Sequence, residues 1–154
     1  MRFTLALIIL FFPIFSYSET IATCFPKTGH AYCADIGIVN KTNSSWQILP
    51  ANGTISLSKL SENDFGILFT DATKEVQSSK EEGAEIKLLR NKNNELTFLV
   101  NDTANDAIEI YDFLQDRNGH NIMTITTNEG GDASFYKSSV EMGDCSYIKF
   151  DKRK

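Results

Sequence analysis

The sequence is poor in the residues on which most catalytic and metal sites depend. Its 154 residues include only two histidines, three cysteines and one tryptophan. It contains no Gly-x-Ser-x-Gly motif, no glycine-rich phosphate-binding motif and no EF-hand string. No residue set therefore specifies a reaction, and the sequence predicts a protein without catalytic residues, metal ligands or a cofactor.

Long apolar runs are also scarce, and the one that is present lies at the N-terminus. Residues 5–15 are apolar, follow Arg2, and precede Ser16 and Ser18, which are small residues at the positions that signal peptidase reads. The run is shorter than the roughly 20 residues that a membrane-spanning helix needs. We predict a cleaved signal peptide over residues 1–18 and export to the periplasm or the extracellular space. No later run predicts a membrane span.

Positive charge is the rarer sign, although the imbalance is mild. Fifteen Lys and Arg residues oppose twenty Asp and Glu residues, and loss of Arg2 with the signal peptide takes the net charge from -5 to -6. Nucleic acids and anionic membranes both recruit basic surfaces. We therefore predict no nucleic-acid partner, and expect a protein partner or a small apolar ligand.

The three cysteines, Cys24, Cys33 and Cys145, all follow the predicted cleavage site, in a compartment that permits disulfides. Three thiols allow one bond and leave one thiol over. Pro26 and Gly29 favour a chain reversal that would join Cys24 to Cys33, and this is the predicted pairing. Cys145 is the alternative partner, in a larger loop that would stabilise the fold more. The odd thiol is either buried in a monomer or joins two chains as a disulfide-linked dimer.

Apolar residues recur at every second position in short runs separated by turn residues, which is the pattern of β-strands. Ile55 and Leu57 alternate with polar residues, and Phe65, Ile67 and Phe69 share one face of a second run. Further strands are predicted over residues 85–90, 95–100, 133–140 and 147–150. Residues 19–154 are therefore predicted to form one all-β domain, a small antiparallel β-barrel or β-sandwich of about eight strands.

Asn118-Gly119 predicts a tight hairpin in the second half of the chain. This dipeptide is typical of a two-residue type I′ turn, in which both residues have positive φ. Counting outward from that turn pairs Tyr111 with Thr126. The register also places Asp112 on the more apolar face, so that Asp112 needs a partner there or the register is different.

Aromatic residues are the remaining candidates for a binding site. A ligand cavity inside a closed barrel would be lined by large apolar side chains. The predicted lining residues are Trp46, Phe69, Phe98, Tyr111 and Phe113. The hairpin register also predicts a second apolar face, which would be exposed in a barrel, made up of Tyr111, Phe113, Ile122, Phe135 and Tyr136.

Three functions are compatible with these features. The first is an exported non-catalytic binding protein, a protein-interaction or inhibitor-type module, with contact residues in loops over residues 25–32 and 128–132. The second is a lipocalin-like carrier of a small apolar ligand. The third, a hydrolase that uses an acidic residue, would need Asp112 or His30 in a cleft with a partner. The first is the function predicted from the sequence.

The signal-peptide prediction is tested by the intact mass of the protein recovered after export. Cleavage after Ser18 leaves residues 19–154, so the measured mass should be that of this segment. A mass that retains residues 1–18 would contradict the predicted cleavage.

Overall fold

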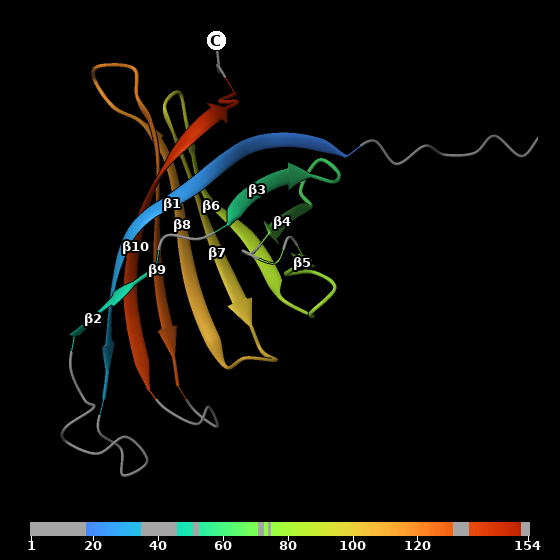
Figure 1. Ribbon diagram of the computed structural model, residues 1–154. Coiled ribbons are helices and arrows are strands. Elements are labelled where there is room, and N and C mark those ends of the chain that lie inside the picture. Colours follow the sequence, from blue (N-terminus) through green and yellow to red (C-terminus); the bar gives the residue numbers. More distant parts are fainter. Residues whose placement is uncertain are drawn as a thin grey trace, which may run out of the picture.

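In the computed structural model, residues 18–34, 46–50, 53–70, 73, 75–130 and 136–151 are described. Residues 1–17 of the predicted signal peptide and Phe135 of the predicted second apolar face lie outside the described residues. Ten strands form one antiparallel sheet (Figure 1). They are β1 (Glu19–Cys33), β2 (Trp46–Leu49), β3 (Thr54–Lys59), β4 (Phe65–Thr70), β5 (Val76–Ser78), β6 (Glu85–Lys92), β7 (Glu95–Asp102), β8 (Ala107–Gln115), β9 (Asn121–Glu129) and β10 (Lys137–Ile148). The all-β antiparallel architecture predicted from the sequence is confirmed.

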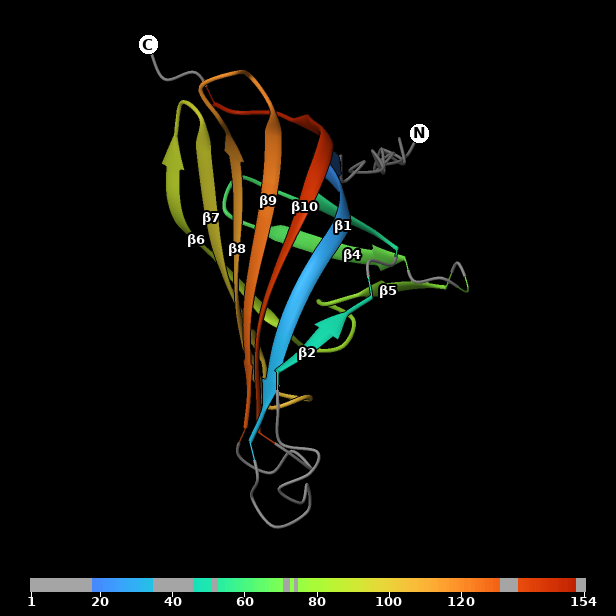
Figure 2. The same ribbon diagram turned by 60° about the vertical axis from the view of Figure 1, so that its left-hand side comes forward.

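The sheet is continuous and curls into a half-barrel. Its strand order is β5-β4-β3-β1-β10-β9-β8-β7-β6, and β2 pairs with the second half of β1. The long strands lie side by side, and β3, β4 and β5 run across them (Figure 2). One face of the sheet is therefore turned inward, and the other face is turned outward.

The curl brings residues from opposite ends of the sheet into contact. Phe65 on β4 and Phe98 on β7 are six strands apart in the sheet order, which in a flat sheet would separate them by about 29 Å. Their ring centroids are 5.0 Å apart, in an edge-to-face arrangement. The inner face is therefore the core. Its largest fully buried side chains are Tyr111, Phe98, Phe113, Leu57, Ile67, Met123, Val100 and Cys24.

Strand β1 bends where it passes from one neighbour to the next. Its pairing with β10 shifts register between Thr23 and Cys24 and again between Pro26 and Thr28. Such bulges increase the local bend and twist, and proline, which cannot donate a ladder hydrogen bond, is tolerated there. Opposite Pro26, a Cβ on Gly143 would lie 2.4 Å from the carbonyl oxygen of Phe25, so only glycine fits. The reversal predicted between Cys24 and Cys33 is wrong, because this segment is one bent strand.

The disulfide joins Cys24 to Cys145, which face each other across β1 and β10. The predicted Cys24–Cys33 pairing is wrong, and the alternative partner forms the bond. The nine steps from Cys24 to Cys33 (33 minus 24) run along one strand and span roughly 30 Å of it, too far for a bond. Cys33 is the free cysteine among the described residues; it is half-buried, near the end of β1.

The turn between β8 and β9 has three residues instead of two. The amide of Gly119, which has a φ of 85°, donates a hydrogen bond to the Asp116 carbonyl over 3.1 Å, and the amide of Asp116 donates to the His120 carbonyl over 2.9 Å. The Asp116 carboxylate accepts hydrogen bonds from the amides of Asn118 and His120, each at 2.8 Å. This carboxylate favours the longer turn because it satisfies two backbone donors.

The extra turn residue shifts the predicted pairing of β8 with β9 by one position. Tyr111 lies opposite Ile125 instead of Thr126, and Asp112 lies opposite Thr124. Because side chains alternate across a strand, this register puts Tyr111 and Phe113 in the core. Their predicted place on an exposed apolar face is therefore wrong.

The structure also joins segments that the sequence analysis divides. One strand, β10, includes residues 137–140 and 147–148 of the closing strands predicted over residues 133–140 and 147–150, together with the segment between them, in which Cys145 is paired with β1. Residues 133–135 lie outside the described residues. A three-residue strand, β5, lies in the polar segment between β4 and β6. These differences lengthen the sheet without changing its class.

The disulfide should contribute much of the stability because it closes a loop with a sequence separation of 121 residues. Replacing both Cys24 and Cys145 by Ala should lower the free energy of unfolding by about 5 kcal/mol, measured by denaturant titration. The control variant Cys33→Ala should change it by only about 1 kcal/mol or less. Equal losses in the two proteins would contradict the assigned pairing.

Candidate functional site

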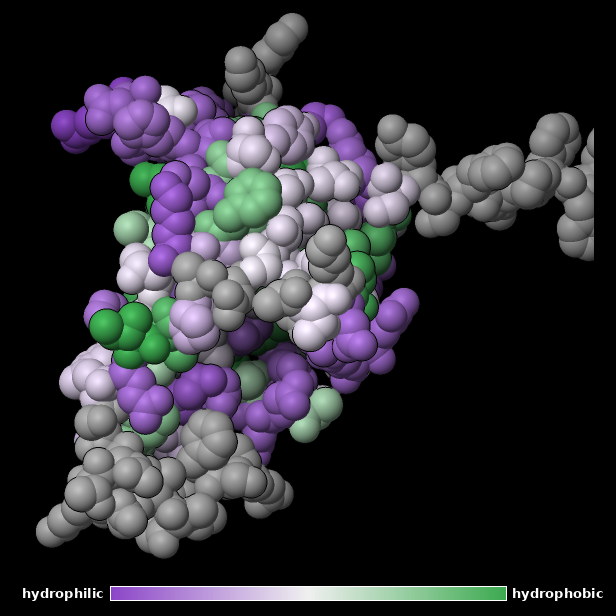
Figure 3. Space-filling view, viewed as in Figure 1, coloured by the Kyte–Doolittle hydropathy of each residue, from purple (hydrophilic) through white to green (hydrophobic). Residues whose placement is uncertain are grey.

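At an open end of the inner face lies a depression that we call the inner cleft. It is a depression of about 220 Å³ beside the ends of β3 and β4. Figure 3 shows a recess near the middle of this side of the molecule, bordered by hydrophilic residues. The cleft is lined by Pro26, Thr54, Ile55, Phe69, Thr70, Glu109, Tyr111, Ile125, Thr127 and Glu141. It therefore combines an apolar floor with two carboxylates.

Glu109 is held in the cleft by two hydroxyl groups. The Tyr111 hydroxyl donates a hydrogen bond to Glu109 Oε2 over 2.8 Å, and the Thr127 hydroxyl donates to Oε1 over 3.4 Å. Burial raises the pKa of Glu109 above its ordinary value of 4.5, and these hydrogen bonds only partly oppose it. The folded protein therefore binds the Glu109 proton more tightly than the unfolded chain, and this group destabilises the fold as pH rises from 4.5 through the raised pKa.

Glu141 is the second carboxylate of the cleft. Burial raises its pKa, and the positive charge of Lys137 opposes that shift. Lys137 itself is bound to Glu129, with 2.6 Å between Nζ and Oε1. The Glu141 side chain crosses Gly29 on β1, where a Cβ would lie 2.7 Å from Glu141 Cγ. The glycine therefore leaves room for this side chain on the inner face.

The cleft can accept hydrogen bonds and attract positive charge. Its described lining holds two carboxylates and no lysine, arginine or histidine. No group of three or more histidine, cysteine, aspartate or glutamate side chains in the described ranges is placed to hold a metal ion. What the described lining offers is thus a weakly hydrated, acidic surface beside aromatic rings.

Four of the five predicted ligand-binding residues meet in the interior. Phe98 and Phe113 have ring centroids 6.2 Å apart, and Tyr111 stacks on Phe113 at 6.4 Å. Phe69 lies 6.4 Å from Tyr111 and is partly buried against this core. The rings pack against one another. Phe69 and Tyr111 also line the inner cleft.

Trp46 lies apart from the other predicted ligand-binding residues. It begins β2, is 67% exposed, and its nearest aromatic contact is Tyr32 at 5.6 Å between centroids. Sequence alone places Trp46 in a strand correctly. It does not show that this strand is short and that, among the described strands, it pairs with β1 alone.

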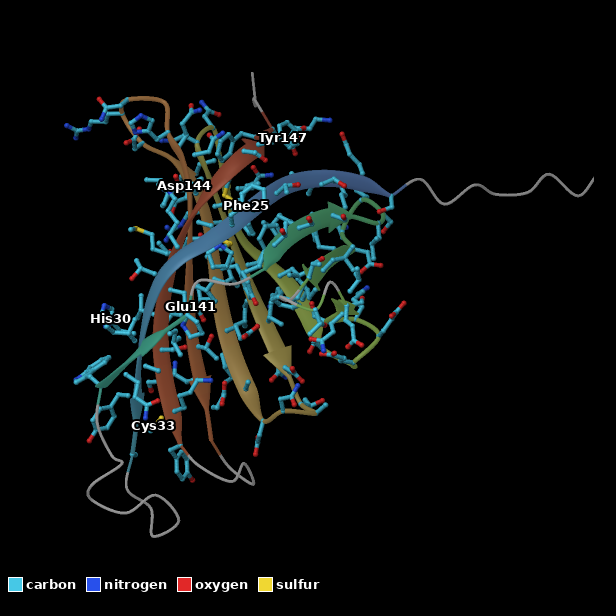
Figure 4. All side chains as sticks on the ribbon, in the orientation of Figure 1. Phe25, His30, Cys33, Glu141, Asp144 and Tyr147 are labelled. Carbon is cyan, nitrogen blue, oxygen red and sulfur yellow. A yellow bond between two sulfur atoms is a disulfide. The ribbon has the colours of Figure 1, made fainter. Side chains whose placement is uncertain are left out.

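Asp112 and His30 are not brought together. The Asp112 carboxylate accepts a hydrogen bond from the Thr97 hydroxyl over 2.6 Å, on the outer face. His30 is on β1, and β9 and β10 lie between it and β8. Figure 4 shows His30 pointing away from the sheet on the side opposite to Glu141. The two residues therefore lie on the outer face of strands that β9 and β10 separate.

The outer face carries a row of side chains across six strands, of which four are apolar and two, Thr126 and His30, are polar. In register, the row runs through Leu99, Ile110, Thr126, Val140, His30 and Ile48. Val140 is 53% exposed and Ile48 is 78% exposed. Green side chains are visible at the surface over β2 in Figure 3. We call the exposed apolar members of this row and their exposed apolar neighbours the outer apolar face: Tyr32, Trp46, Ile48, Ile108, Ile110, Val140 and Met142.

The outer apolar face could not be found from the sequence without the correct register. Its residues occupy alternate positions in β8 and β10. The hairpin register predicted from the sequence, which is wrong by one position, assigns inner and outer residues to the same face. Of the second apolar face predicted from the sequence, Ile122 pairs with Leu114 on the outer side and Tyr136 is exposed. The contact loop predicted over residues 25–32 is instead part of β1.

Comparisons of the chain with protein-family models, with curated proteins and with solved structures find no match. In the described part of the chain, no helix has the length and apolarity needed to cross a membrane. The candidate functional surfaces are therefore the two faces of the sheet and the depressions in them.

The Tyr111 hydroxyl lowers the pKa of Glu109, so its removal should raise that pKa further. We expect Tyr111→Phe to move the Glu109 carboxyl titration to higher pH, measured by carbon-13 NMR of the side-chain carboxyl group. Tyr136→Phe, a control at an exposed tyrosine outside the inner cleft, should leave the titration unchanged. An unchanged or lower Glu109 pKa in Tyr111→Phe would contradict the assigned hydrogen bond.

Proposed function

We propose that this chain is an exported, non-catalytic binding protein that holds a partner protein on its outer apolar face. The observation that carries the proposal is the set of exposed apolar side chains on the outer face of β8, β10, β1 and β2, among them Ile110, Val140, Tyr32 and Ile48. Soluble monomers rarely expose contiguous apolar patches of this kind unless another molecule covers them.

The curl of the sheet leaves the outer apolar face uncovered by the described part of the chain. The inner face is filled by the aromatic core, so the outer side chains cannot reach it. Val140 and Met142 remain exposed although Cys145, on the same strand, is buried. Binding of a protein that covers these side chains would be favourable, because it would remove from water the apolar surface that stays exposed in the folded chain.

The free edge of β2 indicates the form of the partner. In the described chain β2 pairs only with β1, so its other edge offers unpaired backbone groups. The strand Trp46–Leu49 contains no charged residue to block pairing. Trp46 and Ile48 stand beside that edge on the outer side. The partner therefore supplies an extended segment that pairs with β2 and places apolar side chains over them.

Two further features support this function. A disulfide between Cys24 and Cys145 is compatible with an oxidising compartment outside the cytoplasm. The packing of Phe98, Tyr111 and Phe113 against one another disfavours a carrier whose cavity these rings would line. A rigid stapled sheet suits an inhibitor-type or interaction module, because little of its surface must be ordered on binding.

Photo-crosslinking in the native host tests the location of the partner. A benzophenone amino acid should be introduced in turn at Ile48, at Ile110 and, as a control, at Asn93 in the turn between β6 and β7. We expect one adduct of the same mass from Ile48 and Ile110, and none from Asn93. Val140→Glu should abolish both adducts, whereas Gln77→Glu on β5 should preserve them.

Both glutamate variants replace exposed side chains, so each should unfold with a free energy within about 1 kcal/mol of the parent. An adduct with twice the mass of the chain would identify a second copy and contradict a separate partner protein. Absence of adducts at Ile48 and Ile110, or equal adducts at Asn93, would contradict the proposed face.

A further inference from the structure

We propose that a second site, which we call the end pocket, binds a small neutral molecule with an apolar body and one N–H or O–H donor. The end pocket lies at the end of the half-barrel and has a volume of about 270 Å³. It shares no lining residue with the outer apolar face, so this inference is independent of the proposed protein partner.

The end pocket lies where the two ends of the curled sheet approach each other. Its floor is formed by Ile21, Phe65, Leu88, Leu96 and Phe98, which come from β1, β4, β6 and β7. Figure 2 shows the turn between β3 and β4 on the side of the molecule where β6 and β7 lie. Seven polar or charged residues complete the lining, so the pocket joins an apolar floor to a polar margin, a combination that small-molecule sites use to orient a ligand.

One polar atom at the end pocket is left without a partner. Asn91 lines the pocket, and its Oδ1 is buried and accepts no hydrogen bond. Buried acceptors without a donor are uncommon in native structures, since they lose their bond to water on folding. The other end of the amide makes only a long bond, 3.4 Å from Nδ2 to Asp151 Oδ2. The amide can therefore turn to receive a donor from a ligand at little cost.

The charges around the end pocket favour a neutral ligand. Glu19, Glu62 and Asp151 share its margin with Lys59 and Lys149. Lys149 is bound to Glu19, so that pair presents no net charge. An ionised ligand would meet groups of both signs, whereas an uncharged ligand loses little hydration on entry.

The volume sets the size of the ligand. An apolar cavity of about 150 Å³ binds benzene. The end pocket is roughly twice as large as that cavity, so it suits a molecule up to roughly twice the size of benzene. Water in the pocket can hydrogen-bond to the polar margin, whereas the five apolar side chains of the floor offer it no partner. Indole fits these requirements, with an apolar bicyclic body and one N–H donor.

Proton–nitrogen NMR titration with indole and benzofuran tests the proposal. Benzofuran has nearly the same shape but no N–H donor. We expect indole to shift the amide signals of Leu96 and Phe98, and benzofuran to bind about tenfold more weakly because the Asn91 oxygen stays unpaired. Asn91→Leu should remove the preference for indole, while Asn93→Leu, an exposed control in the same hairpin, should retain it.

The two ligands are compared on the unaltered protein, so the test does not depend on the folding of a variant. Equal affinity for indole and benzofuran would overturn the role of the Asn91 oxygen. No shift with indole up to its solubility limit, or shifts confined to the outer apolar face, would overturn the site. None of these results depends on the crosslinking outcome at Ile48 and Ile110.

Discussion

The curl of one continuous sheet is the constraint on which the rest of this structure depends. The chain has no described helix with which to cover a sheet face, so the sheet must enclose its own core. It does so by bringing β4 against β7, where Phe65 meets Phe98 at 5.0 Å between ring centroids. Phe69 on β4 likewise contacts Tyr111 on β8, so two pairs of aromatic rings join the distant strands. The same curl leaves the opposite face of the sheet to solvent or to another molecule.

The junction of β1 with β10 makes the curl possible. Bulges at Cys24 and Pro26 bend β1, and Gly143 allows the two backbones to approach at the bend. The Cys24–Cys145 disulfide closes the same junction. Because β1 pairs with β10, β3 and β2, it directs one half of the sheet inward and leaves β2 at a free edge. The inner cleft and the end pocket lie where the half-barrel remains open.

Alternation of apolar residues made the fold class predictable from the sequence. It identified the strands now seen as β3, β4, β6 and β7, because each is short and bounded by turn residues. It could not identify the disulfide, since the adjacency of β1 and β10 arises from pairing between chain ends. It also missed the register of β8 with β9, because the Asp116 carboxylate stabilises a three-residue turn where Asn118-Gly119 alone indicates two.

The candidate sites were less predictable than the fold. Phe69, Phe98, Tyr111 and Phe113 do gather in the interior, as large apolar residues on one face should, but they pack against one another. The exposure of Trp46 could not be predicted without the sheet order, because it follows from the place of β2 beside β1. Glu109 and Glu141 could not be singled out, because their burial depends on the open inner face. The sequence-predicted register of β8 with β9 is wrong by one residue. That error places core residues and outer-face residues on the same side of the sheet, so the outer apolar face could not be recognised.

Detection of the contact between the two distant ends of the sheet would test the curled sheet most directly. Nuclear Overhauser measurements should show a cross-peak between the ring protons of Phe65 and Phe98, which a half-barrel requires and a flat sheet forbids. A missing cross-peak, in spectra where both rings show their neighbours on adjacent strands, would contradict the curled sheet and the two faces defined by it.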